Sequence, residues 1–91
     1  MDRDRLEREL RATFGASDES ARVVARQARD LADGGTYADD IGHDLTVEEI
    51  VQNLADAPDG HTLAERWNWW LGALELSHGG YERFRVRPDV V

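Results

Sequence analysis

The sequence contains no lysine and no cysteine. All 11 basic residues are arginine, and 19 aspartates and glutamates give a formal net charge of -8. This acidic, lysine-free composition predicts a protein of a salt-rich cytoplasm, because screening over about 3 Å at 1 M salt removes the repulsion between surface carboxylates. A coding bias that replaces lysine with arginine would give the same composition, and this alternative stays open. The absence of cysteine excludes disulfides and thiolate metal sites.

Long apolar runs are also missing. The first five residues, Met1–Arg5, are charged where a signal peptide would need an apolar segment. The longest nearly apolar run, Trp67–Leu74, spans about eight residues, whereas a membrane-spanning helix needs about 20. Hydrophobic residues make up 41% of the chain, which is enough for a modest core. We therefore expect one cytoplasmic domain over residues 1–91 and no membrane partner.

Four segments have the sequence pattern of a helix. The first two combine apolar residues at helical spacing with charged outer positions, and the last two open with a Thr-x-x-Glu capping box. The expected helices cover residues 4–14, residues 17–32 after a Ser17 cap, residues 46 to about 57, and residues 62–77.

Two segments between and after these helices have other patterns. Residues 37–45 indicate a loop or a single turn. Residues 81–87 alternate between apolar and polar side chains and stop at Pro88, which is typical of a strand. The sequence therefore predicts a mainly α fold: a compact bundle of about four helices with a short C-terminal β-strand or hairpin.

The expected last helix contains the sequence Trp67-Asn68-Trp69-Trp70 and is apolar on two sides. At about 100° per residue, one side carries Leu63, Trp67, Trp70, Leu71 and Leu74. The opposite side carries Trp69, Gly72, Ala73 and Leu76. Such a helix either lies at the centre of its domain or is half core and half interface.

Three interpretations of the second side remain open. The rest of the chain covers it, a second copy or another protein binds it, or it lines an aromatic pocket for a small molecule. Because tryptophan is enriched at interface hot spots, we predict a partner interface at Trp69, Gly72, Ala73 and Leu76 and a homodimer or another protein as the partner.

Arginines form two groups in this acidic chain. Arg83, Arg85 and Arg87 share one side of the expected strand, and Arg22, Arg26 and Arg29 share one side of the second helix. Guanidinium groups at such spacing either contact phosphates or lie over neighbouring carboxylates.

The segment Leu45–Leu54, the turn after it, the next helix, Gly79-Gly80 and the basic segment resemble the order of elements in winged helix-turn-helix DNA-binding domains. The resemblance implies that the helix from Thr62 enters the major groove of DNA. It also implies that Arg83, Arg85 and Arg87 lie on the wing and contact the nucleic acid.

No pattern in the chain indicates catalysis. The three histidines, His43, His61 and His78, are far apart, and the acidic stretch 39–44 lacks the oxygen spacing of a calcium loop. No phosphate loop or nucleophile elbow is present. We predict a non-catalytic interaction or regulatory module without cofactor or metal. A DNA-binding transcriptional regulator is the alternative.

Overall fold

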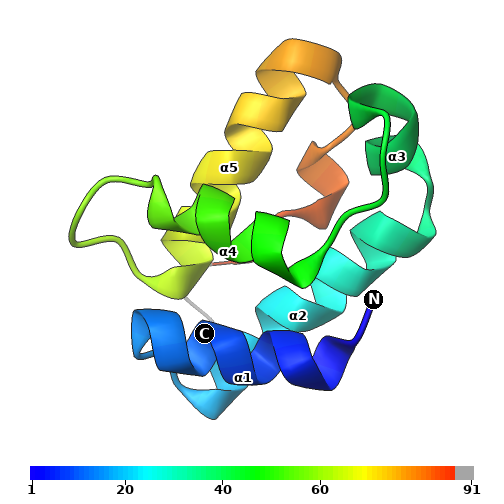
Figure 1. The fold of residues 1–91 in the computed structure, drawn as a ribbon. Helices are drawn as coiled ribbons and strands as arrows, with labels where there is room; N and C mark the ends of the chain where they lie inside the picture. Colours follow the sequence, from blue (N-terminus) through cyan, green and yellow to red (C-terminus); the bar gives the residue numbers. More distant parts are fainter. Residues whose placement is uncertain (88–91) are drawn as a thin grey trace.

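Five α-helices and one 3-10 turn make up the fold in a computed structural model that describes residues 1–87. The helices are α1 (Arg3–Phe14), α2 (Asp18–Asp33), α3 (Thr36–Ile41), α4 (Val47–Ala55) and α5 (Leu63–His78), and the 3-10 turn is η1 (Glu82–Phe84). Figure 1 shows α4 crossing in front of α5, with α1 and α2 below them. The short η1 turn packs between α2 and α5.

Side-chain caps fix the starts of four helices. Asp2, Ser17, Thr46 and Thr62 each accept a hydrogen bond from a backbone N–H group of the first turn that follows. Such caps satisfy donors that have no partner inside the helix. The four helices predicted from the sequence are confirmed, each within about two residues at either end.

The core joins the apolar sides of these helices. Small side chains on α2 allow its close packing against the rest of the chain, and the largest fully buried side chains are Trp67 and Tyr81. Among residues 1–87 no charged side chain is fully buried. No helix in this range has the length and apolarity needed to cross a membrane.

Residues 36–41 form a short helix, α3, where the sequence left a loop or single turn open. Its start has no side-chain cap, because the residue at that position, Gly35, has no side chain. Tyr37 holds the helix in place, since its ring is buried and its hydroxyl donates a hydrogen bond to Glu49 of α4.

The predicted C-terminal strand is wrong for residues 81–87. Residues 82–84 form a 3-10 turn, and no strand occurs in the part of the chain that the structure describes. The buried residues are Tyr81, Phe84 and Val86, so their spacing is three and then two rather than a regular alternation. The remaining residues, 88–91, lie outside the described range, so a hairpin that uses Val90 and Val91 does too.

Candidate interaction surface on α5

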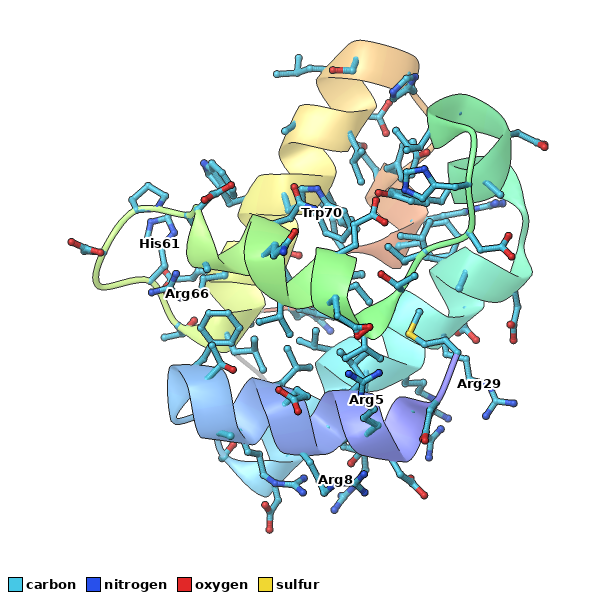
Figure 2. All side chains as sticks on the ribbon, viewed as in Figure 1. Arg5, Arg8, Arg29, His61, Arg66 and Trp70 are labelled. Atoms are coloured by element: carbon cyan, nitrogen blue, oxygen red, sulfur yellow. The ribbon has the colours of Figure 1, made fainter. Side chains whose placement is uncertain are left out.

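Helix α5 begins with a capping box. The Thr62 hydroxyl accepts from the Glu65 N–H, and the Glu65 carboxylate accepts from the Thr62 N–H at 2.8 Å. The bond from this backbone donor holds the pKa of Glu65 below its ordinary value. One turn further, Arg66 donates to the backbone oxygen of Leu54 at 3.0 Å, and its guanidinium lies over the Phe14 ring. Figure 2 shows Arg66 directed from α5 towards the C-terminal end of α1, which Phe14 forms. The start of α5 is thereby fixed to both α4 and α1.

The inner face of α5, defined by Leu63, Trp67, Trp70, Leu71 and Leu74, is buried. Trp67 is fully enclosed, and its indole N–H donates to the backbone oxygen of Phe84 at 2.9 Å. Trp70 meets Trp67 edge-on with 5.6 Å between ring centroids, and it meets Tyr37 at 5.9 Å. Figure 2 shows Trp70 on the side of α5 that faces α4. Edge-on aromatic pairs of this kind add to the stabilisation from burial.

Asn68 binds the backbone of the terminal segment, residues 79–87, at a single residue. Its side-chain amide donates to the Val86 oxygen at 2.7 Å, and its side-chain oxygen accepts from the Val86 N–H at 2.9 Å. A neighbouring strand would satisfy the same two backbone groups in a sheet. An α5 side chain thus takes the place of a strand partner.

Glu75 holds the beginning of the terminal segment. Its carboxylate accepts from the N–H groups of Gly80, Tyr81 and Glu82 at 3.1, 2.9 and 3.0 Å. These bonds from backbone donors, that of Tyr81 first, hold the pKa of Glu75 below its ordinary value. Trp67, Asn68 and Glu75 therefore fix the terminal segment along α5 by six hydrogen bonds to its backbone.

The outer face of α5, defined by Trp69, Gly72, Ala73 and Leu76, is exposed except at Gly72. Trp69 is 39% exposed and Leu76 is 91% exposed. Ala73 is also exposed, while Gly72 is half-buried. One guanidinium nitrogen of Arg85 lies 3.4 Å from the position that a Cβ atom on Gly72 would occupy. The predicted interface residues thus share one surface, and the Arg85 guanidinium lies against its central glycine.

The three C-terminal arginines do not share one face. Arg83 lies over the Phe84 ring, 4.8 Å from its centroid, while Arg85 lies beside Gly72. Arg87 is exposed, as are the other two. No carboxylate of residues 1–87 forms an ion pair with any of them. Their different directions follow from the 3-10 turn that replaces the expected strand.

The three arginines of α2 are exposed. Arg29 pairs with Asp33 of its own helix at 3.6 Å, whereas Arg22 and Arg26 are exposed and have no carboxylate partner within the described range. Figure 2 shows Arg29 and, on α1, Arg8 directed away from the protein. Arg29 is therefore the one arginine of this group that pairs with a carboxylate of the described residues.

A polar network ties α3 to its neighbours. The Glu49 carboxylate accepts from the Tyr37 hydroxyl and contacts His43 Nε2 at 2.9 Å, and the Tyr81 hydroxyl donates to Asp40 at 2.8 Å. Burial, together with these carboxylate acceptors, raises the pKa of both tyrosines above the ordinary value. No three His, Asp or Glu side chains among residues 1–87 are placed to hold a metal ion. These contacts join α3 to α4 and to the terminal segment.

Sequence reasoning missed the roles of Asn68 and Glu75, which appear in the pattern only as polar residues beside the apolar sides of the helix. Their partners lie 18 and five to seven residues further along the chain. The one available signal was the position of Asn68 between two tryptophans, because an amide that is removed from water needs hydrogen-bond partners.

These features define a small helical domain in which a tryptophan-rich helix organises both the core and the terminal segment. Residues 1–75 match the family model described as the WNWW domain. Since the match covers more than four fifths of the 91 residues, the chain belongs to the WNWW domain family. The four letters of that description are the residues 67–70 of this chain. No match was found among curated proteins or among solved structures.

Proposed function

We propose that this domain is a self-associating interaction module and that the outer face of α5 pairs with the outer face of a second copy. The observation that carries the proposal is the order of exposed side chains along this face. A bulky Trp69 and a bulky Leu76 flank the two small residues Gly72 and Ala73. The other three positions of the Trp-Asn-Trp-Trp sequence have contacts inside the fold, so Trp69 is the one available to a partner.

The order bulky, small, small, bulky is symmetric about the midpoint of Gly72 and Ala73. In an antiparallel pair of helices related by a two-fold axis, residue i of one copy meets residue j of the other and the reverse. Trp69 of one copy then packs on Leu76 of the second, and Gly72 lies opposite Ala73. The small residues allow the two helix backbones to approach closely. The outer face is therefore complementary to itself.

The size of the outer face predicts a weak dimer. Its two bulky residues are about 10 Å apart along the helix axis, at a rise of about 1.5 Å per residue. Stable complexes bury roughly 800 Å² per partner, and smaller interfaces are transient. We therefore expect a dissociation constant above about 10 µM. A weak, reversible association suits a regulatory module.

Salt should strengthen this association. Each copy has a formal net charge of -8, so two copies repel each other in dilute buffer. Screening at molar salt removes most of that repulsion, while burial of Trp69 and Leu76 remains favourable. The same screening should raise the melting temperature of the protein as KCl goes from dilute to molar. A melting temperature that stays constant or falls as KCl increases would contradict adaptation to a salt-rich cytoplasm.

Sedimentation equilibrium of the whole chain at several concentrations in 2 M KCl tests the proposal. Wild type should show a mass that rises above 10.3 kDa with concentration. Trp69→Ser and Leu76→Ser should lower the association, and Ala12→Ser, at an exposed position on α1, should not. A mass of 10.3 kDa at every concentration and salt would refute self-association.

Contact with DNA remains the alternative. One observation favours it, because Arg83, Arg85 and Arg87 are all exposed and none pairs with a carboxylate among residues 1–87. Helix α5 adds little to it, since Arg66 and Asn68 are bonded to backbone groups of the same chain. If all three arginines were changed to glutamine and duplex binding at moderate salt were unchanged, this alternative would lose its support.

A further inference from the structure

The small residue at the centre of the outer face is already covered by the protein itself. Gly72 is half-buried, and the Arg85 guanidinium lies against it, with Nη2 3.4 Å from the position of a Cβ atom. We call this covered position the Gly72 notch. A second helix that approaches the outer face closely must occupy the same space, because Gly72 stands beside Ala73 at the midpoint of the symmetric pattern. Arg85 and the second copy therefore cannot both occupy the notch.

The position of Arg85 is set by its neighbour in the chain. The Asn68 side chain bonds both backbone groups of Val86, so the peptide next to Arg85 is fixed one helical turn before Gly72. On the other side, Trp67 bonds the backbone oxygen of Phe84. Arg85 thus has a fixed point on each side and a side chain long enough to reach the notch. By contrast, Arg87 lies beyond Val86, and no contact between it and Gly72 occurs.

We propose that Arg85 competes with the second copy for the Gly72 notch and that Asn68 is the positioning residue that holds Arg85 there. This inference rests on the proposed self-association. The domain then has two states: a closed monomer with Arg85 over Gly72, and a dimer in which Arg85 has moved into solvent. Displacing one exposed side chain costs little free energy, so the contact tunes the association and does not block it. Any condition that draws Arg85 into solvent favours the dimer.

Arg85→Ala and Arg87→Ala form a matched pair that tests the competition. Each substitution removes one positive charge from an exposed position of the same segment, so the net charge of the protein changes by the same amount in both. Only Arg85→Ala also uncovers the notch. Sedimentation equilibrium in 2 M KCl should therefore show roughly two- to fivefold tighter association for Arg85→Ala than for Arg87→Ala. Equal affinities would overturn the competition.

A double-mutant cycle tests the positioning role of Asn68. Asn68→Ala should tighten association in the wild-type background and leave it unchanged in the Arg85→Ala background, because the notch is then already open. The same change in both backgrounds would show that Asn68 acts only through stability. If Asn68→Ala does not fold, Asn68→Asp replaces it, since the carboxylate keeps an acceptor for the Val86 N–H and loses the donor to the Val86 oxygen.

The outcomes separate this inference from the proposed function. If Trp69→Ser abolishes association while the two arginine variants agree, self-association stands and the competition is refuted. If wild type associates, Trp69→Ser lowers that association and Arg85→Ala associates more tightly than Arg87→Ala, both are supported. If wild type, Arg85→Ala and Trp69→Ser are all monomers at every concentration, the outer face does not bind a second copy and the inference fails with it.

Discussion

Two neighbouring tryptophans of α5 have opposite surroundings. Trp67 is fully buried and bonds the backbone of Phe84, while Trp69, two residues later, is 39% exposed and lies beside exposed Ala73 and Leu76. A helix turns by about 200° over two residues, so these positions point in nearly opposite directions. The same residue type therefore serves the core on the inner face of α5 and is available to a partner on the outer face.

The comparison predicts two separable roles for the four-residue sequence. Trp67, Asn68 and Trp70 fix the terminal segment and the short helix α3 to α5, through hydrogen bonds and aromatic contacts. Trp69, in contrast, is 39% exposed. Substitutions on the inner face should therefore change stability, and those on the outer face should change association.

Trp67→Ala should have the largest effect. Removing a fully buried tryptophan leaves a cavity and costs about 3–5 kcal/mol in the free energy of unfolding, and here it also leaves the Phe84 oxygen without its donor. Trp69→Ala should cost about 1 kcal/mol or less, because its side chain is partly in solvent already. Urea unfolding followed by circular dichroism measures both. Equal losses for the two variants would remove the distinction between the faces.

Alkaline pH should act next, on the surroundings of the inner face. Burial and carboxylate acceptors raise the pKa of Tyr37 and Tyr81, which are the two tyrosines of the chain. Because the pKa of each tyrosine is higher in the folded state, only the unfolded chain ionises just above about pH 10. The contribution of the tyrosines to the free energy of unfolding is therefore fully present below about pH 10 and is lost as the pH rises further. Tyrosinate absorbance should therefore appear together with unfolding.

Single substitutions provide the control for the alkaline experiment. Tyr37→Phe and Tyr81→Phe should each reduce the dependence of the free energy of unfolding on alkaline pH. If tyrosinate forms near pH 10 in a protein that remains folded, the two hydroxyls are not held by Glu49 and Asp40 as described.

Asn68→Ala should have an intermediate effect. The substitution leaves the N–H and the oxygen of Val86 without partners, and a half-buried unpaired group costs about 1–3 kcal/mol. Protection of the Val86 amide against hydrogen exchange should fall with it. Asn68 stands between Trp67 and Trp69 in the sequence. A larger loss in the free energy of unfolding for Asn68→Ala than for Trp69→Ala would support the distinction between the two faces. Unchanged exchange at Val86 would contradict the hydrogen bonds.

Much of the helical fold could be predicted from the sequence because its signals are local. The caps at Ser17, Thr46 and Thr62 and the apolar spacing after them lie within a few residues of the structure that they specify. Helix α3 has no side-chain cap and only six residues, so its sequence did not distinguish a loop from a single turn. Its stability comes from Tyr37 and α4, and no local pattern reports such a contact.

The terminal segment shows why the rest could not be predicted. Alternation over residues 81–87 is typical of a strand, but a strand needs a partner, and its backbone groups bind Trp67, Asn68 and Glu75 of α5 instead. Those bonds join residues up to 18 positions apart. The two-sided apolar pattern of α5 did predict which residues share the outer face, and their role as an interface stays a prediction.

Gly72→Ala should have the smallest effect on stability and the opposite sign. Gly72 has helical backbone geometry inside α5, where alanine is favoured over glycine by about 0.5–1 kcal/mol. The new methyl group meets only the movable end of the Arg85 side chain at 3.4 Å. The free energy of unfolding should therefore rise by up to about 1 kcal/mol.

The same methyl group should weaken self-association, because it occupies the notch that a second helix needs. Ala73→Gly is the matched reverse change: it should lower stability by about 0.5–1 kcal/mol and leave room for the second copy. For Gly72→Ala, a higher free energy of unfolding together with weaker self-association would show that one position affects stability and association in opposite directions. If Gly72→Ala gained stability and associated as wild type does, the two helices would not meet at Gly72. Trp69 would then bind another part of the second copy's surface.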